Sequence, residues 1–230
     1  MSTILALDTS TENCSAALSI NGNVLVRELE SPREHTKRIL PMVDSLLSEA
    51  GIKLKDLDAL AFGRGPGSFT GVRIGTGIAQ GLAFGADLPM LPISTLAAMA
   101  QGAHRLHKVT DVLPAIDARM GEIYFGQYKL NNAGIMTLVD NEMVVTPDDL
   151  LANFNKPEQA FHTLGTGWAT YAEQLAALNV AKLTACEGIQ FPASQDMIAL
   201  AAADYENGKA VAGEDAMPVY VRDTVTWKKL

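Results

Sequence analysis

The sequence predicts an α/β protein of two similar lobes, each a mixed sheet flanked by helices. The first observation is a pattern that occurs twice, starting near residues 4 and 112. In each case an apolar run ends in an aspartate, a turn follows, and two strand-like segments are joined by an Asn/Gly turn. The second observation is that helical periodicity follows the strands. The lobes are expected to span residues 1–108 and 109–230.

The first lobe opens with predicted strands at 4–7, 14–20 and 24–29. Asn21-Gly22 joins the last two and strongly favours a two-residue type I′ turn. The next segment has helical periodicity, with an apolar face formed by Ile39, Val43, Leu46, Leu47 and Ala50. Pro41 within it predicts a kink or a late start, and Gly51 predicts its end.

A glycine-rich run from Gly63 to Gly85 follows the predicted strand at 57–62. Its first half has the Gly-Pro-Gly punctuation of a tight loop, and its second half has helical spacing, with Ser68 or Thr70 as the cap. Two stripes of small residues run along this helix, one formed by Gly77, Gly81 and Gly85 and the other by Gly71, Gly75, Ala79 and Ala83. Such stripes allow close approach of a second helix, which could belong to another chain.

The remaining elements complete the two lobes. A strand at 89–93 and a helix capped by Ser94 and ending near 106 close the first lobe. The second lobe is predicted to contain strands at 112–116, 122–130 and 135–145, a strand ending at 164, a helix near 168–178, a helix at 194–206 and a strand-like tail at 217–229. The helix at 194–206 is expected to pack back on the first lobe.

Composition restricts the function classes. The net charge of −8 argues against this chain being the main nucleic-acid-binding subunit, because phosphate binding needs a Lys/Arg surface. The two cysteines give no disulfide framework. The sequence contains no apolar run of about 20 residues and no signal-peptide pattern, so the protein is expected in the cytoplasm and not in a membrane.

Two hairpin-opened lobes with helices describe the actin-like, hexokinase-like ATPase architecture (ASKHA). In that architecture a nucleotide lies between the lobes, on the turns after the first strand of each. Asp8 and Asp117 occupy these turns. A vestigial nucleotide site would therefore consist of Asp8, Thr9, Ser10, Gly67, Asp117 and Arg119.

Each of these residues also has a structural interpretation. The turn after Asp8 lacks the glycine that a phosphate loop uses, so a structural turn is favoured there, and a packing role is favoured for the glycine loop, which is not a Walker loop. Asp117 and Arg119 can lock their turn or contact a ligand or partner, and these alternatives are evenly balanced.

The chain resembles the bacterial TsaB (YeaZ) family. The segments ILALDTST, REHTKRILPMVD, GRGPGSFTGVRIGTGIAQGLA and IDARMGEIY occur in this order and carry the resemblance over the whole chain. The family is similar to the TsaD family, which with TsaB and the ATPase TsaE installs N6-threonylcarbamoyladenosine beside the anticodon of tRNA. The resemblance implies a partner subunit that holds TsaD through helices while TsaD carries the chemistry.

The resemblance also bears on catalysis. The catalytic sister family places two metal-binding histidines on the helix after the glycine helix, where Thr95 and Met99 stand here. Neither side chain replaces imidazole as a ligand. His104 and His107 lie beside Arg105 and Lys108, which favours a solvated basic end over a metal site. No catalytic residue, no metal and no firmly bound cofactor are therefore expected, although ATP or ADP can enter the complex.

The predicted interface lies on the two helices of the first lobe, in a four-helix contact with two helices from each chain. It consists of Arg33, His35, Ile39, Met42, Val43, Leu46, Gly71, Arg73, Ile74, Gly77, Ile78 and Gly81. The same surface could support a self-dimer, because the partner is structurally similar. TsaE, and tRNA through the complex, are further expected components.

Three alternative functions are open at this stage. One is a metal-dependent glycoprotease-like peptidase, which the missing histidine pair disfavours. Another is a stand-alone ATP-binding protein of the same fold, which the glycine-free turn after Asp8 disfavours. The third is a tRNA-binding module, which the acidic balance disfavours; Trp227 with Lys228 and Lys229 is weak support for it.

Overall fold

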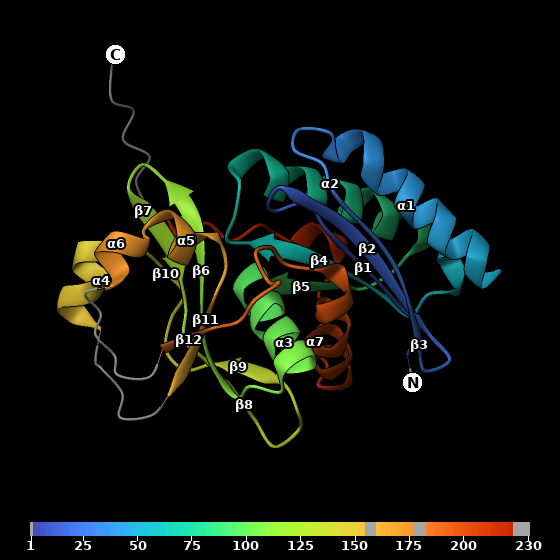
Figure 1. The fold of residues 1–230 in the computed structure, drawn as a ribbon. Helices are drawn as coiled ribbons and strands as arrows, with labels where there is room; N and C mark the ends of the chain where they lie inside the picture. Colours follow the sequence, from blue (N-terminus) through green and yellow to red (C-terminus); the bar gives the residue numbers. More distant parts are fainter. Residues whose placement is uncertain (1, 155–159, 177–182, 223–230) are drawn as a thin grey trace, which may run out of the picture.

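The computed structural model describes residues 2–154, 160–176 and 183–222 and shows two sheets with helices around them (Figure 1). The first sheet has the strand order β3-β2-β1-β4-β5. Its strands are β1 (Ile4–Asp8), β2 (Asn13–Ile20), β3 (Asn23–Glu30), β4 (Ala59–Gly65) and β5 (Met90–Ser94). Strands β1, β2 and β3 are antiparallel neighbours, whereas β4 and β5 run parallel to β1.

The second sheet repeats this topology. Its main path is β10-β7-β6-β11-β12, where β6 pairs antiparallel with β7 and parallel with β11. The strands are β6 (Asp111–Arg119), β7 (Glu122–Phe125), β10 (Met143–Val145), β11 (Phe161–Leu164) and β12 (Leu183–Ala185), with β8 (Tyr128–Leu130) and β9 (Met136–Leu138) beside the path. This duplicated arrangement is the actin-like ATPase fold, and it confirms the fold class predicted from the repeated pattern.

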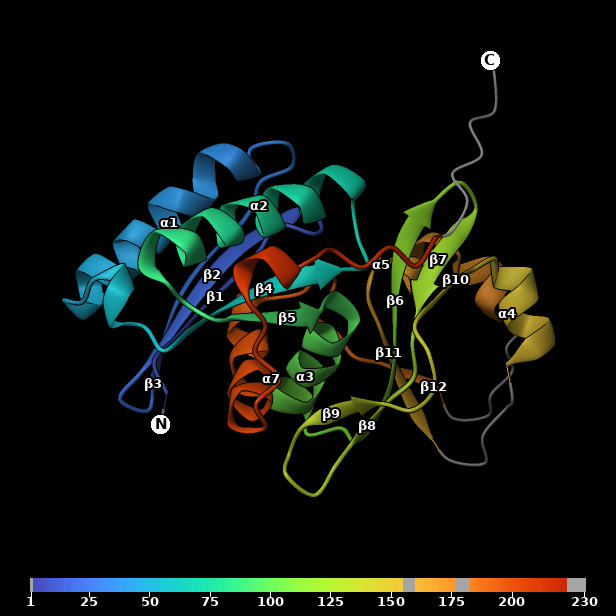
Figure 2. The same ribbon diagram turned by 180° about the vertical axis from the view of Figure 1, so that it is seen from behind.

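Helices cover both faces of the first sheet (Figures 1 and 2). Helices α1 (His35–Ala50) and α2 (Phe69–Ala86) lie on one face, and α3 (Thr95–His107) and α7 (Ser194–Glu206) on the other. Helix α7 contacts α3, β1 and β2, so a helix from the second half of the sequence packs on the first sheet. The second lobe contains α4 (Pro147–Asn153), α5 (Thr166–Thr170) and α6 (Ala172–Leu175).

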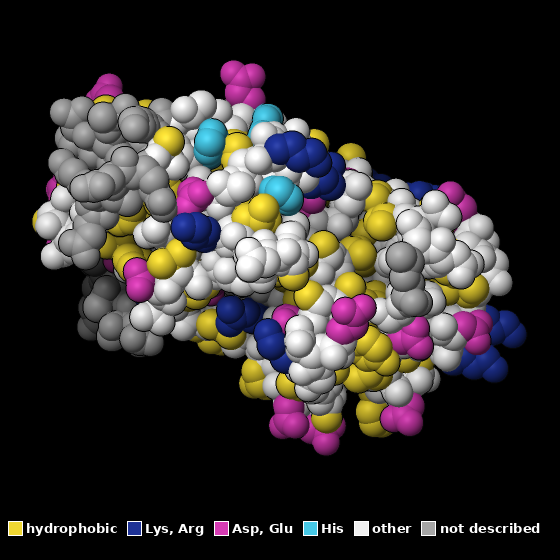
Figure 3. Space-filling view, turned by 90° about the horizontal axis from the view of Figure 1, so that it is seen from below, with side chains coloured by type: hydrophobic (Ala, Val, Ile, Leu, Met, Phe, Trp, Pro, Cys, Tyr) yellow, Lys and Arg dark blue, Asp and Glu magenta, His cyan; other side chains and the backbone are white. Residues whose placement is uncertain are grey.

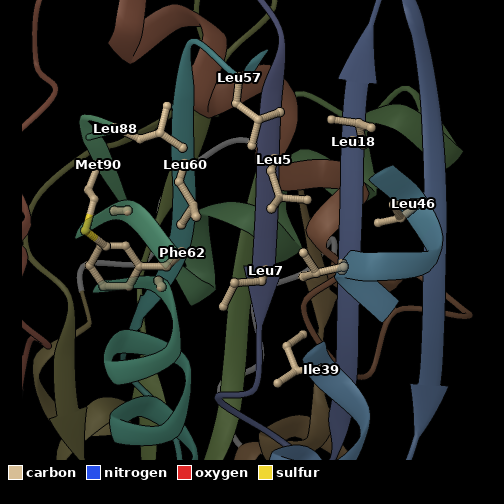
Figure 4. Close-up of a cluster of buried hydrophobic side chains, with 14 of the residues drawn as sticks. Leu5, Leu7, Leu18, Ile39, Leu46, Leu57, Leu60, Phe62, Leu88 and Met90 are labelled. Carbon is tan, nitrogen blue, oxygen red and sulfur yellow. The ribbon is translucent and has the colours of Figure 1, made fainter. Parts of the chain in front are cut away.

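A core of leucines and aromatic residues lies between the first sheet and helices α1 and α2. Figure 4 shows Ile39 and Leu46 of α1 facing Leu5, Leu7 and Leu18 of the sheet. All five side chains are fully buried. This burial anchors α1 on the sheet and leaves its opposite side free.

Local signals place most element ends. Asn21 and Gly22 both have positive φ, as a type I′ turn requires. Ser68 caps α2 by accepting from the Gly71 amide, and Gly51 ends α1 in the left-handed conformation. Pro41 lies inside α1, and the helix begins six residues before it, so the predicted late start is wrong.

Three expectations in the second lobe are corrected. The predicted strand at 122–130 divides in two, because Gly126 donates back to the Pro114 carbonyl and the chain then pairs with β6 at a new place. The predicted strand at 135–145 also divides, into β9, which pairs with β8, and β10, which pairs with β7. Helix α4 was not predicted, although Thr146 caps it and Pro147 begins it. The segment at 168–178 forms two short helices, with residues 177–178 outside the described ranges.

The last described segment crosses from one lobe to the other. Residues 217–222 form no strand, in contrast to the prediction for 217–229, of which residues 223–229 lie outside the described ranges. Val211 bridges to Met90 on β5, and the Val219 amide donates to the Arg64 carbonyl at 2.8 Å. Arg222 then donates to the Ala118 carbonyl of β6 at 3.2 Å. The segment therefore joins the edge of the first sheet to the second lobe.

Candidate functional site

The inner face of α2 packs on the turn after β1. A Cβ added at Gly71 would lie 2.2 Å from the Thr9 carbonyl oxygen, and one at Gly75 would lie 2.7 Å from Thr9 Oγ1. Thr9 Oγ1 in turn donates to the Gly71 carbonyl at 2.7 Å. Ala79 and Ala83 continue the buried stripe. One of the two predicted stripes thus serves packing within the chain.

The outer face of α2 carries the second stripe, and nothing in the described chain covers it. A Cβ added at Gly77, Gly81 or Gly85 would meet no heavy atom within 4 Å. Phe84, beside Gly81 and Gly85, is 91% exposed. Glycines inside a helix cost about 1 kcal/mol each relative to alanine. No close contact of this stripe within the described chain offsets that cost. The outer face therefore has the features of a contact surface.

Several predicted interface residues are not on this surface. Ile39, Val43 and Leu46 belong to the core beneath α1 (Figure 4), and Gly71 lies against Thr9. His35 is also buried. These five residues are buried within the chain and do not lie on its exposed surface: the apolar face of α1 that periodicity reveals packs on the sheet, and Gly71 of α2 packs on the Thr9 turn.

The other predicted interface residues reach the surface to different extents. Arg33, Arg73, Gly77 and Gly81 are exposed, and Met42, Ile74 and Ile78 are partly buried. Sequence reasoning missed three exposed hydrophobic residues on the two helices, namely Leu40, Phe69 and Phe84. Phe84 follows Gly81 by three positions, so a large apolar side chain next to the glycine stripe was the available signal.

The turn after β1 is closed by the glycine loop. Asp8 is 1% exposed and accepts from the Ser10 amide at 3.0 Å and from Ser10 Oγ at 2.9 Å. A Cβ at Gly63 would lie 1.7 Å from Asp8 Oδ2, and one at Gly67 would lie 2.3 Å from the Ser10 carbonyl oxygen. Burial raises the pKa of Asp8 from its ordinary value of 3.8 to about 7.

This geometry does not fit a nucleotide phosphate. A phosphate loop offers free backbone N–H groups to the anion, but the Ser10 amide is already bonded to Asp8. Glycines that could have cradled phosphate instead admit the turn itself. The residues Asp8, Thr9, Ser10 and Gly67 therefore do not fit an ATP phosphate with its Mg²⁺.

The matching turn of the second lobe is exposed and faces the first. Arg119 pairs with Asp117 at 2.9 Å within its own turn and with Glu12 at 3.1 Å in the other lobe. Tyr171 also donates to Asp117 Oδ1 at 3.2 Å. Arg119 thus locks its turn and also contacts the opposite lobe; both of its neighbours are protein carboxylates.

A second cross-lobe contact is buried. Glu142 accepts from Ser94 and from Tyr128, the latter at 2.6 Å, and its other oxygen lies 3.4 Å from Arg64 Nη2. Burial and the Glu142 charge raise the pKa of Tyr128 well above its ordinary range. Ser94 and Arg64 come from the first sheet, so this network is a buried polar contact between the lobes, beside the apolar packing of α3 on β6.

His104 and His107 each lie against a different backbone carbonyl. His104 Nδ1 lies 3.0 Å from the Val109 carbonyl, and His107 Nε2 lies 2.9 Å from the Glu187 carbonyl. Thr95 and Met99 are buried on α3, where Thr95 donates to Ser10 Oγ at 3.3 Å. Among the residues that the structure describes, no group of three or more His, Cys, Asp and Glu side chains could hold a metal ion.

The face opposite α1 and α2 shows no broad basic area. Figure 3 shows acidic, basic and hydrophobic side chains interspersed there, with histidines beside a small group of Lys and Arg side chains. The described helices include none that is long and apolar enough to cross a bilayer.

The fold and the site define a class: an actin-like two-lobed protein whose first phosphate turn is filled by its own glycine loop. The model of a family described as tRNA N6-adenosine threonylcarbamoyltransferase (TsaD) matches residues 28–229. The tRNA threonylcarbamoyladenosine biosynthesis protein TsaB of Escherichia coli K12 is 49% identical, with 99% of this chain and 97% of that protein covered. The chain belongs to the TsaB (YeaZ) family.

Other relatives agree with this assignment. TsaB of Haemophilus influenzae is 47% identical, again with 99% of this chain and 97% of that protein covered. The structure of YeaZ from Pseudomonas aeruginosa is 44% identical, covers 96% of this chain and 100% of its own, and superposes with a TM-score of 0.87. Another structure from that organism is described as similar to the peptidase YeaZ.

Proposed function

We propose that this chain is a non-catalytic subunit in tRNA threonylcarbamoyladenosine biosynthesis that binds a TsaD subunit and activates it. The observation that carries the proposal is the open glycine stripe on the outer face of α2. Gly77 and Gly81 leave space for a second helix to approach closely, and Phe84 adds apolar area beside them. The names of the relatives supply the pathway.

The mechanism is scaffolding. A helix pair of the partner covers α2 and the exposed side of α1, and the burial of this surface fixes the geometry of the partner's cleft. The closed turn at Asp8 supports a role without nucleotide turnover in this chain, because its donors are already used. TsaE and tRNA, with ATP or ADP, join through the partner.

The test is light-scattering mass on a sizing column, for the chain alone and mixed with purified TsaD. We expect a heterodimer peak that grows as any self-dimer peak shrinks. Gly81→Leu should abolish it and leave the fold intact, because the added side chain meets open space. Leu106→Ala, which removes an exposed leucine from α3 on the other face of the sheet, is the matched control and should bind normally. Normal assembly of Gly81→Leu would refute the proposal.

The peptidase description of one relative names the competing function. Proteolysis of purified TsaD by this chain, abolished by a chelator, would contradict a non-catalytic role. We expect no cleavage, since the described His, Cys, Asp and Glu side chains form no cluster suited to a metal.

A further inference from the structure

We infer that the contact with TsaD does not end at the helices but continues across the lobes. A groove of about 570 Å³ lies between the start of α2 and strand β7. We name it the cross-lobe groove; it is lined by Pro66, Phe69, Val72, Tyr124, Tyr220 and Arg222. The inference rests on the proposed function and assigns the groove to an apolar side chain of the same partner, with a carboxylate beside it for Arg73.

The groove is built from both lobes. Phe69 and Val72 belong to α2, Tyr124 belongs to β7, and the segment at 219–222 also lines the groove. Arg222 ties that segment to the second lobe through its ion pair with Glu122. Figures 1 and 2 show the tip of the β6–β7 hairpin on the same side of the molecule as α1 and α2. A partner seated on α2 can therefore reach it.

Apolar side chains stand exposed around the groove. Phe69 is 60% exposed, Tyr220 is 44% exposed, and their ring centroids are 5.9 Å apart. Met120 at the hairpin tip is 63% exposed and has φ +61°, an unfavourable conformation for a residue with a side chain. It lies next to the groove, with its sulfur 3.7 Å from Arg222 Nη1. Exposed apolar groups of this kind mark contact sites.

The positive charge of Arg73 at the rim of the groove indicates which partner group fits there. Arg73 stacks over Phe69, 3.2 Å from the ring centroid, and lies 5.0 Å from that of Tyr220. It pairs with no carboxylate among the described residues, whereas Arg64 pairs with Glu142 and Arg222 with Glu122. An acidic group next to an apolar side chain complements this arrangement.

The surface area that a stable interface needs also supports a contact that extends beyond the two helices. A stable interface buries roughly 800 Å² on each partner. Helices α2 and α1 have 18 and 16 residues, so they are about 27 Å and about 24 Å long, and each presents only a strip about 10 Å wide. The cross-lobe groove and Met120 supply additional surface that is continuous with α2.

The experiment measures the affinity of purified TsaD for the full-length chain and four variants by calorimetry. Tyr220→Asp and Arg73→Glu should each weaken binding at least tenfold, and Arg73→Glu should also reduce its dependence on salt. Leu106→Asp on α3 is the control and should bind like wild type. Gly81→Leu tests the helical contact separately. Thermal unfolding of each variant confirms that it is folded.

The outcomes separate the two proposals. If Gly81→Leu abolishes binding while Tyr220→Asp and Arg73→Glu bind like wild type, the groove proposal is overturned and the proposed function stands. If none of these variants affects binding, both fail. If the groove variants abolish only self-association of the chain, the occupant is a second copy and the assignment to TsaD is overturned.

Discussion

At the residue scale, Asp8 shows how a polar turn becomes part of a core. Its carboxylate is held by Ser10 and enclosed where Gly63 leaves room for it. The enclosure removes water from the charged form, which raises the pKa of Asp8 to about 7. The protonated side chain is therefore the form that the folded state prefers over much of the range below neutrality.

This pKa predicts a pH dependence of stability. Between 3.8 and about 7 the folded state binds more protons than the unfolded state, so the free energy of unfolding falls as pH rises through this window, by up to about 1.4 kcal/mol per pH unit. Asp8→Asn should flatten the dependence and be the more stable protein at pH 8. Urea unfolding from pH 4.5 to 8 measures it.

The control for this prediction is Asp44→Asn, which changes an exposed carboxylate on α1. It should leave the slope as in wild type. Parallel curves for wild type and Asp8→Asn would show that Asp8 is charged throughout and that the enclosure does not bind the proton.

At the element scale, α2 has two faces of small residues with opposite uses. The inner glycines admit the Thr9 turn, and the outer glycines face open space. Small residues on the inner face are therefore needed for folding, whereas those on the outer face carry only a cost to the isolated chain.

A matched pair of substitutions tests this division. Gly71→Ala should destabilise the isolated chain by several kcal/mol, because its Cβ meets a backbone carbonyl that cannot move freely. Gly77→Ala should stabilise it by about 0.5–1 kcal/mol, because alanine favours the helix and meets nothing. Chemical denaturation gives both values. Equal effects of the two changes would contradict the assignment of faces.

At the scale of the whole molecule, the lobes are joined by apolar packing of α3 on the second lobe, by polar contacts and by the crossing segment that contains Arg222. One buried polar contact is the network of Glu142 with Ser94, Tyr128 and Arg64. Removing a member of such a network leaves the others buried without a partner, which costs more than losing an exposed ion pair.

Glu142→Ala should therefore lower the free energy of unfolding by about 2–4 kcal/mol. Glu49→Ala breaks the exposed pair with Arg27 and should cost less than about 1 kcal/mol. Guanidinium unfolding followed by fluorescence and circular dichroism measures both, and loss of coincidence between the two probes in Glu142→Ala would indicate that the lobes unfold separately. A cost as small as that of Glu49→Ala would rule out a structural role for the network.

Most elements of the first lobe and the duplicated topology follow from local signals in the sequence. Hairpin turns, caps and apolar periodicity depend on residues close in the chain, so Asn21-Gly22, Ser68 and Ser94 were sufficient to place them. The repeated strand–Asp–turn pattern likewise predicted two lobes. The prediction of the second-lobe strands was wrong where the chain changes its pairing at Gly126. That change of pairing depends on contacts with β6 and not on local sequence preference.

Which surfaces are free depends on contacts between residues far apart in the sequence. Both stripes of α2 are compatible with burial, and the turn at Thr9 is what selects the inner one. Likewise, periodicity identified Ile39, Val43 and Leu46 as one apolar face of α1. The sheet covers that face, so only the other side of α1 is open to a partner. The cross-lobe groove is formed by Phe69, Tyr124 and Tyr220, which come from distant parts of the chain, so no local pattern could have revealed it.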